Sequence, residues 1–341
     1  MRALLLQNPL SMGTCQRDEP NAREAEALMQ VHSIGICGSD LHAYRGHHPF
    51  VSYPRILGHE LGGEVIEVGP NPRGLRVGDS VCVEPILNCG QCYPCRQGRY
   101  NCCMGIRVLG IHTDGGMAER IAVPVNRLHK SEDDLSHDEL ALCETLSIGV
   151  QAVKRGKVRA GESVLILGGG PIGLGALIAA RARGARTIVS DPSASNREAA
   201  ENMGADAVVD PGASDFRQRI RAATGEESGA HVVLEAVGVP ETILQAIDHA
   251  APTGRVVVIG VCKDLVPLAV AELMRKEVAL LTTRNSCEAF PAVLELFRSY
   301  RDELRRMVTH HFLLEDGPRV FSWLHQNRAG SGVIKAILHV D

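Results

Sequence analysis

The chain has 341 residues, 45% of them hydrophobic and 22% charged, which is typical of a globular protein with about two domains. Its formal net charge is −4 and it has no basic tract, so we exclude nucleic acid as a partner. No apolar run reaches about 18 residues, which excludes a membrane-spanning helix. The short apolar run at residues 3–6 predicts a first strand and not a signal peptide, so we expect a cytoplasmic protein.

Residues 1–146 are predicted to form a small β domain. Short runs of β-type residues occur at 65–69, 79–85 and 119–124, and the segments between them carry Gly, Pro and Asn. This pattern is typical of an irregular β domain or a partly open barrel.

Residues 147–283 are predicted to form a second, α/β domain. Six apolar runs alternate with helix-like segments, and such runs indicate parallel strands that helices cover on both faces. A doubly wound sheet of the dinucleotide-binding kind follows from this pattern. The runs are Ser163–Leu167, Thr187–Ser190, Ala207–Val209, Val232–Leu234, Val256–Ile259 and Val278–Leu281. The tail, 284–341, contains a helical stretch and a last strand, and we expect it to return to the first domain.

A glycine-rich turn follows the first of these strands. Residues 168–173 fit the pattern G-x-G-x-x-G and stand between a predicted strand and a predicted helix, the context in which the motif is informative. Gly168 permits the tight turn, Gly170 lets a pyrophosphate approach, and Gly173 lets the helix pack close to the sheet. Pro171 and Ile172 complete the turn at the N-terminus of the helix, where free N–H groups favour an anion.

Asp191 ends the second strand of this domain, about twenty residues beyond the glycines. A carboxylate at that spacing binds the ribose hydroxyls of a dinucleotide and repels a 2′-phosphate, which favours NAD over NADP. Arg197 lies close enough in sequence to contact the cofactor and to soften that preference. The alternative is a turn without a ligand and an aspartate that only caps a helix.

Four of the eleven cysteines stand close together. Cys89, Cys92, Cys95 and Cys103 have the spacing C-x2-C-x2-C-x7-C, which suits one tetrahedral zinc. Four thiolates leave no open position, so such a site is structural. The neighbouring Cys102 is an alternative to Cys103, and two disulfides are the alternative to a metal.

Three other segments carry candidate ligands of an open metal site. They contain Cys37, the pair His59-Glu60 and the pair Cys143-Glu144. One thiolate, one imidazole and one carboxylate leave a position for substrate, which suits a Lewis acid. Spacing alone does not unite residues so far apart, and each could be an ordinary buried side chain.

Several stretches together resemble the zinc-containing medium-chain dehydrogenases. They are GICGSDLH, GHELGGEV, the four-cysteine loop, ETLSIGVQAV and LGGGPIGLG. The resemblance implies a GroES-like β domain and a Rossmann domain, with zinc and NAD as cofactors. It implies that Cys37 and His59 bind a catalytic zinc, that Glu60 binds or supports it, and that Glu144 is the third ligand in the manner of the sorbitol dehydrogenase branch. The adjacent Cys143 keeps that last assignment open.

The resemblance also suggests a route for the proton. Family members carry Ser or Thr at the position of Ser39 and a histidine at that of His42, which predicts a relay from substrate through Ser39 and His42 to water. The alternative is that Ser39 caps a helix and that His42 is a surface residue.

The stretch from residue 42 to residue 60 resembles L-galactonate, L-idonate and L-gulonate 5-dehydrogenases. We therefore expect a polyhydroxy substrate, with Tyr44 in its pocket and Arg284 near a carboxylate. Threonine 3-dehydrogenase and a general alcohol dehydrogenase are alternatives within the family. A non-enzymatic protein on a dehydrogenase scaffold is the alternative of another class. A homo-oligomer is expected, with a tetramer favoured over a dimer.

Overall fold

The computed structural model describes residues 1–225, 228–327 and 332–340, and the chain divides into two compact units. The first unit contains residues 1–144 and 308–341, and the second contains residues 145–307. The chain passes from the first unit to the second inside helix α3, His137–Arg155. Within the described ranges, no helix is long and apolar enough to cross a bilayer.

A seven-stranded sheet forms the framework of the first unit. Its order is β16-β17-β3-β4-β5-β9, and β8 also pairs with β3. All pairs are antiparallel except β16 with β17. The strands are β3 (Glu26–Gly35), β4 (Glu60–Val68), β5 (Ser80–Val83), β8 (Arg120–Pro124), β9 (Leu128–Lys130), β16 (Val308–Leu313) and β17 (Lys335–His339).

Smaller elements complete the first unit. The hairpin of β1 (Arg2–Asn8) with β2 (Ser11–Gln16) and the pair β6 (Ile86–Leu87) with β7 (Arg107–Val108) are both antiparallel. The helices are α1 (Gly38–Tyr44), α2 (Tyr93–Arg96) and α10 (Gly317–Asn327). The core is apolar and is built from β1, β3, β4 and α10; it includes Leu4, Leu6, Met29, Ile34, Leu61 and Phe321.

Gly62 explains how α3 comes close to this sheet. A Cβ atom on Gly62, in β4, would lie 2.0 Å from the carbonyl oxygen of His137, at the start of α3. No side chain therefore fits at this position. The missing side chain lets the first turn of α3 lie against the strand that begins with Glu60.

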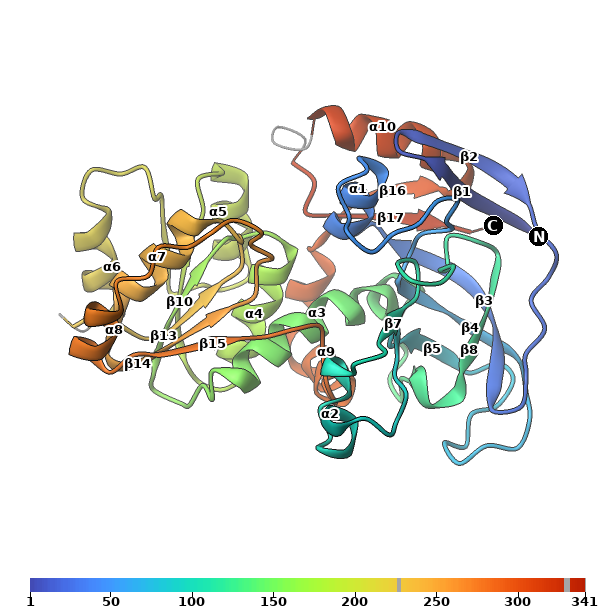
Figure 1. Ribbon diagram of the computed structural model, residues 1–341, viewed down its shortest axis with the longest axis horizontal. Helices are drawn as coiled ribbons and strands as arrows, with labels where there is room; N and C mark the ends of the chain where they lie inside the picture. Colours follow the sequence, from blue (N-terminus) through green and yellow to red (C-terminus); the bar gives the residue numbers. More distant parts are fainter. Residues whose placement is uncertain (226–227, 328–331, 341) are drawn as a thin grey trace. The chain divides into compact units, whose positions relative to one another are not determined.

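The second unit contains the predicted parallel sheet (Figure 1). Its order is β12-β11-β10-β13-β14-β15, with every pair parallel, which confirms the doubly wound expectation. The strands are β10 (Ser163–Leu167), β11 (Arg186–Ser190), β12 (Ala207–Val209), β13 (Ala230–Glu235), β14 (Ala250–Val258) and β15 (Ala279–Thr282). The helices are α4 (Pro171–Arg181), α5 (Ala194–Asn202), α6 (Phe216–Thr224), α7 (Pro240–His249), α8 (Val270–Lys276) and α9 (Phe290–Arg305).

The boundary after the sheet differs from the expected one. Residues 284–307 belong to the second unit, and the return to the first begins only at Val308. The reason is that α9 packs against α4 of the same unit. Arg181 lies 3.6 Å from a carboxylate oxygen of Glu303, and its guanidinium lies 5.2 Å from the centre of the Tyr300 ring.

Candidate active site and metal centres

The turn between β3 and α1 positions Cys37. Cys37 is the N-cap residue of α1, and its backbone N–H donates a 2.9 Å hydrogen bond to the carboxylate of Asp40. Asp40 therefore satisfies a free N–H of the first turn and fixes the start of the helix. Ser39 lies inside this turn, so the alternative that Ser39 caps the helix is wrong.

The start of β4 brings an imidazole and a carboxylate to the same place. Gly58 has φ +95°, and a Cβ atom there would lie 2.8 Å from Cγ of Met117, so only glycine fits before His59. The ligand atoms of Cys37, His59 and Glu60 all lie within 4.8 Å of one another. The oxygen Oγ of Ser39 lies 3.4 Å from Nε2 of His59. The structure thus unites three residues that sequence spacing alone could not.

Lys335 is a site residue that the sequence analysis missed. It lies on β17, is only 3% exposed, and donates hydrogen bonds of 2.7 and 2.6 Å to the two carboxylate oxygens of Glu60. Burial lowers the pKa of Lys335, but the charges of Glu60 and Cys37 outweigh this effect and raise the pKa. The available signal was a single lysine inside the apolar run of residues 333–340.

Glu144 lies nearby but outside this three-residue group. Burial raises its pKa to about 7, while the charge of His59 acts in the opposite direction. The neighbouring Cys143 is buried, and its thiol contacts the carbonyl oxygen of Glu139. Burial and Cys82 raise the pKa of Cys143 well above its ordinary value, and its thiol lies outside the group of Cys37, His59 and Glu60.

The charges of this interior cluster fit a divalent cation. Three buried carboxylates (Asp40, Glu60 and Glu144) and the Cys37 thiol share the site with two basic groups, His59 and Lys335. Burial lowers the pKa of His59, but Asp40 and Cys37 raise it well above its ordinary value. Burial raises the pKa of Asp40 and of Glu144, so ionising all of these acids is costly unless a cation neutralises their charge. A thiolate, an imidazole and a carboxylate are the donors that zinc prefers.

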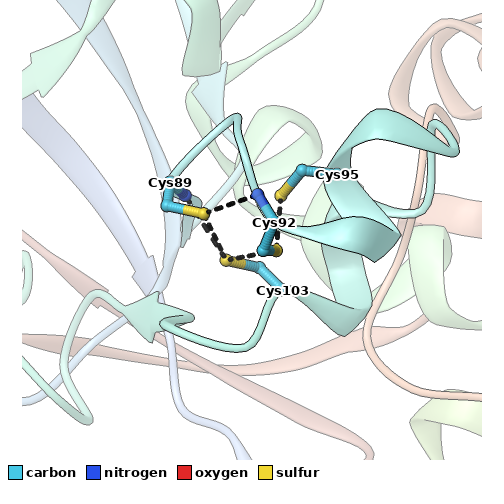
Figure 2. A group of neighbouring side chains, drawn as sticks. All are labelled: Cys89, Cys92, Cys95 and Cys103. Atoms are coloured by element: carbon cyan, nitrogen blue, oxygen red, sulfur yellow. Dashed lines mark hydrogen bonds between the residues drawn. The ribbon is translucent and has the colours of Figure 1, made fainter.

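The second metal centre is the loop of four cysteines (Figure 2). The sulfur of Cys92 lies 3.4 Å from that of Cys95 and 3.8 Å from that of Cys103, and Cys103 lies 3.5 Å from Cys89. Four sulfurs around one zinc with bonds of about 2.3 Å are about 3.8 Å apart. The distances are far too long for disulfides, and Cys102 is outside the group.

Backbone N–H groups support thiolates in this loop. The N–H of Cys92 donates to the sulfur of Cys89 at 3.4 Å, and that of Cys89 donates to the sulfur of Cys103 at 3.4 Å. Hydrogen bonds from the backbone of Gln91 and Cys92 lower the pKa of Cys89. The donor set therefore fits a closed, structural zinc.

The glycine turn of the second unit has the geometry that a dinucleotide requires. Gly168 has φ +100°, and a Cβ atom on Gly173 would lie 1.8 Å from the carbonyl oxygen of Gly168. Gly170 is the N-cap of α4, which starts with Pro171 and Ile172, and a Cβ atom on Gly170 would meet nothing within 4 Å. The backbone is thus open to an approaching diphosphate at the N-terminus of α4.

Asp191 lies beside this turn, at the end of β11. Its carboxylate accepts hydrogen bonds from the N–H groups of Gly169 at 2.7 Å and Ser193 at 2.8 Å. Arg197 donates to the carbonyl oxygens of Asp191 and Pro192 at 2.8 and 2.9 Å. The carboxylate is therefore held at the glycine turn, and the guanidinium is held by the backbone.

The remaining predicted residues lie in different surroundings. His42 is exposed on α1, three residues after Ser39 and therefore on the same side of the helix. Tyr44 is buried in the core, where its ring packs on Phe321 and its hydroxyl donates to the carbonyl oxygen of Leu10 at 3.4 Å. Arg284 is exposed in the second unit, after β15. Their roles toward substrate stay predictions.

The first unit is a GroES-like β unit that contains an interior metal-ligand cluster. The second is a doubly wound unit with a dinucleotide-binding turn. Together these features define a metal-dependent oxidoreductase. Residues 23–133 match the model of the alcohol dehydrogenase GroES-like domain, and residues 171–299 match that of the zinc-binding dehydrogenases. The chain therefore belongs to the zinc-binding alcohol dehydrogenase family, which confirms the resemblance and the fold class.

Curated relatives match nearly the whole chain. It is 37% identical to L-galactonate-5-dehydrogenase of Escherichia coli K12, over 92% of each chain. It is 36% identical to L-threonine 3-dehydrogenase of Pyrococcus abyssi, over 86% of each.

Solved structures agree with the fold. A Sinorhizobium meliloti 1021 protein crystallised with NADP is 32% identical and has a TM-score of 0.91, covering 99% of this chain and 98% of that one. An Escherichia coli CFT073 alcohol dehydrogenase in complex with NADH is 27% identical, with a TM-score of 0.91 and 99% coverage of both chains.

Proposed function

We propose that the chain oxidises a secondary alcohol of a sugar acid or polyol and reduces NAD. The observation that carries the proposal is the cluster of Cys37 with the buried residues His59 and Glu60, whose donors fit zinc. The same chain also contains the dinucleotide-binding turn of residues 168–173. Zinc bound there supplies a Lewis acid that polarises the alcohol, and NAD supplies the hydride acceptor.

Within this proposal, Glu144 is the third protein ligand and Glu60 supports the site. Lys335 already holds both oxygens of Glu60, so that carboxylate is neutralised without a metal. Glu144 is buried beside His59, and burial raises its pKa to about 7. A divalent cation would favour the ionised form of Glu144.

Ser39 and His42 conduct the proton of the alcohol to solvent in this proposal. Ser39 lies beside His59, and His42 lies one turn further along α1 at the surface. A hydroxyl can accept one proton while it donates another, and an exposed imidazole exchanges protons with water near neutral pH.

NAD is preferred over NADP in this proposal because the carboxylate of Asp191 stands at the glycine turn, where it would repel a 2′-phosphate. Arg197 is tied to backbone carbonyls and lies 3.2 Å from Asp210, which reduces its availability to a phosphate. The sugar-acid substrate is supported by the similarity to L-galactonate-5-dehydrogenase. The similarity to L-threonine 3-dehydrogenase makes threonine the second candidate.

A substrate panel tests the proposal. Sugar acids, polyols, threonine and short alcohols are offered to the zinc-loaded protein with NAD or NADP, and reduction is followed by absorbance. We expect the highest kcat/KM with a sugar acid or polyol and NAD. Preference for threonine would establish the second candidate, and no reduction with any compound would support a non-enzymatic role.

We also propose that the protein acts as a homo-oligomer in the cytoplasm. The strand β15 lies at an edge of the parallel sheet, and exposed apolar side chains follow the neighbouring β14; they include Val261, Leu265, Val270 and Met274. An edge strand with apolar surroundings favours pairing with a second copy. The reduced thiols that the metal centres need favour the cytoplasm. Sedimentation analysis tests the assembly, for which a tetramer is expected.

A further inference from the structure

Three potential metal ligands meet at the surface of the first unit, apart from the centres described above. They are Asp138 in the first turn of α3, His311 on β16 and His339 on β17, and their ligand atoms lie within 4.8 Å of one another. Nδ1 of His311 lies 3.0 Å from Nε2 of His339 and 3.5 Å from Oδ2 of Asp138. Nδ1 of His339 lies 3.7 Å from Oδ1 of Asp138.

The fold holds these side chains in place. In the parallel pair of β16 and β17, Leu313 is opposite His339, so His311 and His339 point to the same face two residues apart. Their rings stack with centres 5.2 Å apart. Ser33, which is opposite His339 on β3, donates a 2.6 Å hydrogen bond to Oδ1 of Asp138. The second oxygen of Asp138 is thereby turned toward His311.

We propose that Asp138, His311 and His339 bind one divalent transition-metal ion, such as Zn²⁺ or Cu²⁺. Metal–ligand bonds of about 2.1 Å place neighbouring donors about 3.0 to 3.4 Å apart. Nδ1 of His311 is 3.0 Å from Nε2 of His339 and 3.5 Å from Oδ2 of Asp138, so these three atoms are close to that spacing around His311. Two imidazoles and a carboxylate suit these ions, and the partial exposure of the residues leaves positions for water or another ligand. The hydroxyl of Ser33 orients the carboxylate, as outer partners of metal ligands commonly do.

The ion would join three segments that lie far apart in sequence. His311 and His339 belong to the part of the chain that returns to the first unit, and Asp138 belongs to α3. The strand of His339 also carries Lys335, which holds Glu60. The bound ion therefore cross-links β16, β17 and α3 on the surface of the unit that contains the zinc cluster.

Equilibrium dialysis of the zinc-loaded protein tests this site. The wild type is first freed of loosely bound metal and then titrated with Zn²⁺ at pH 7.5. We expect one more Zn²⁺ per chain than the catalytic and structural sites hold. His311→Gln and His339→Gln are expected to weaken its binding by about 10-fold or more.

His310→Gln is the matched control. His310 is the neighbour of His311 on β16 but faces the other way, where its ring lies against Phe312 and Trp323. This variant is expected to bind the additional ion as the wild type does. A Cu²⁺-loaded sample gives a second signature, because electron paramagnetic resonance detects nitrogen coupling from two imidazoles. That coupling should be present in His310→Gln and reduced in His339→Gln.

Two results would overturn the proposal. The wild type could bind no additional Zn²⁺, or His311→Gln and His339→Gln could both bind it as tightly as the wild type does. Either would show that the two imidazoles and the carboxylate only hydrogen-bond to one another. Because the readout is bound metal and not turnover, it is independent of whether the proposed oxidation is correct.

Discussion

The hydroxyl of Ser39 and the ion pair of Lys335 with Glu60 both lie at the interior cluster, and they have different roles in our account. Ser39 lies 3.4 Å from His59 through Oγ, on the first turn of α1. Lys335 donates hydrogen bonds to the carboxylate of Glu60 and to the carbonyl oxygen of Ile36. The first residue is placed to move a proton, and the second is placed to neutralise a charge.

Replacing Ser39 by Ala removes the proposed first member of the relay. We predict that kcat falls about 100-fold and that the pH profile of kcat changes, because no hydroxyl accepts the proton of the substrate. Steady-state kinetics from pH 6 to 10 measure both effects. Ser322→Ala, on α10, serves as the control and should match the wild type. An unchanged kcat and pH profile in Ser39→Ala would show that the relay is wrong.

Replacing Glu144 by Gln distinguishes the two candidate carboxylates. We predict that Glu144→Gln loses one of two zinc ions per chain, because Glu60, the carboxylate that remains beside Cys37 and His59, is already paired with Lys335. Glu60→Gln should keep that zinc, with lower stability because Lys335 is left buried without its partner. Metal analysis after dialysis gives the answer. Loss of zinc in Glu60→Gln alone would reverse the assignment.

At the scale of elements, a buried polar network connects the end of β5 with β9 and the residue that precedes β9. Glu84 follows β5 and lies 3.0 Å from Arg127 and 3.1 Å from His129. Burial raises the pKa of Glu84, but its hydrogen bond with His129 and the charge of Arg127 give a net lowering. Burial is the main reason why the pKa of His129 is lowered, and its pairing with Glu84 does not compensate.

This network predicts that the first unit loses stability in acid. Both groups have lower pKa values in the folded chain than in the unfolded one, so their contribution is present above the unfolded values and declines as pH falls through the folded ones. We predict that the unfolding temperature falls between pH 7.5 and pH 4.5, because His129 binds a proton more readily in the unfolded chain, and that His129→Gln makes this fall shallower. Thermal unfolding at several pH values measures it. Equal slopes in the two proteins would contradict the prediction.

A matched pair of cysteine variants tests whether the cysteine loop binds a structural zinc. Cys95→Ser should lose one zinc per chain and lower the unfolding temperature by at least about 5 °C, because this short loop depends on its metal. Cys102→Ser changes a thiol in the same loop that lies outside the cluster, and it should keep the zinc and the unfolding temperature. Metal analysis and calorimetry measure both. The opposite pattern would show that Cys102 is a zinc ligand and that Cys95 is not.

Local patterns predicted those elements whose causes are local. The strand of residues 163–167 and the turn of residues 168–173 are adjacent in sequence, and the structure forms both. The pairing of Lys335 with Glu60 spans 275 positions and depends on how β17 joins the sheet. The place of α9 depends on packing against α4, which a helical period does not reveal. Long-range pairing and packing are therefore what the sequence left undetermined.

At the scale of the whole molecule, the two units contribute separate parts of one chemistry. The first unit contains both zinc-type donor clusters, and the second contains the glycine turn with Asp191. Glu144 is the last residue of the first unit, on a helix that continues into the second. Family membership follows from matches across both units, whereas the substrate depends on side chains such as Arg284 that no motif fixes.

The most direct test of the central claim is NAD reduction with the best substrate of the panel before chelation, after chelation and after zinc is restored. We predict that removing one zinc per chain abolishes reduction, that added Zn²⁺ restores it, and that Cys37→Ser is not restored. Reduction that continues at the full rate in protein lacking this zinc would contradict the account.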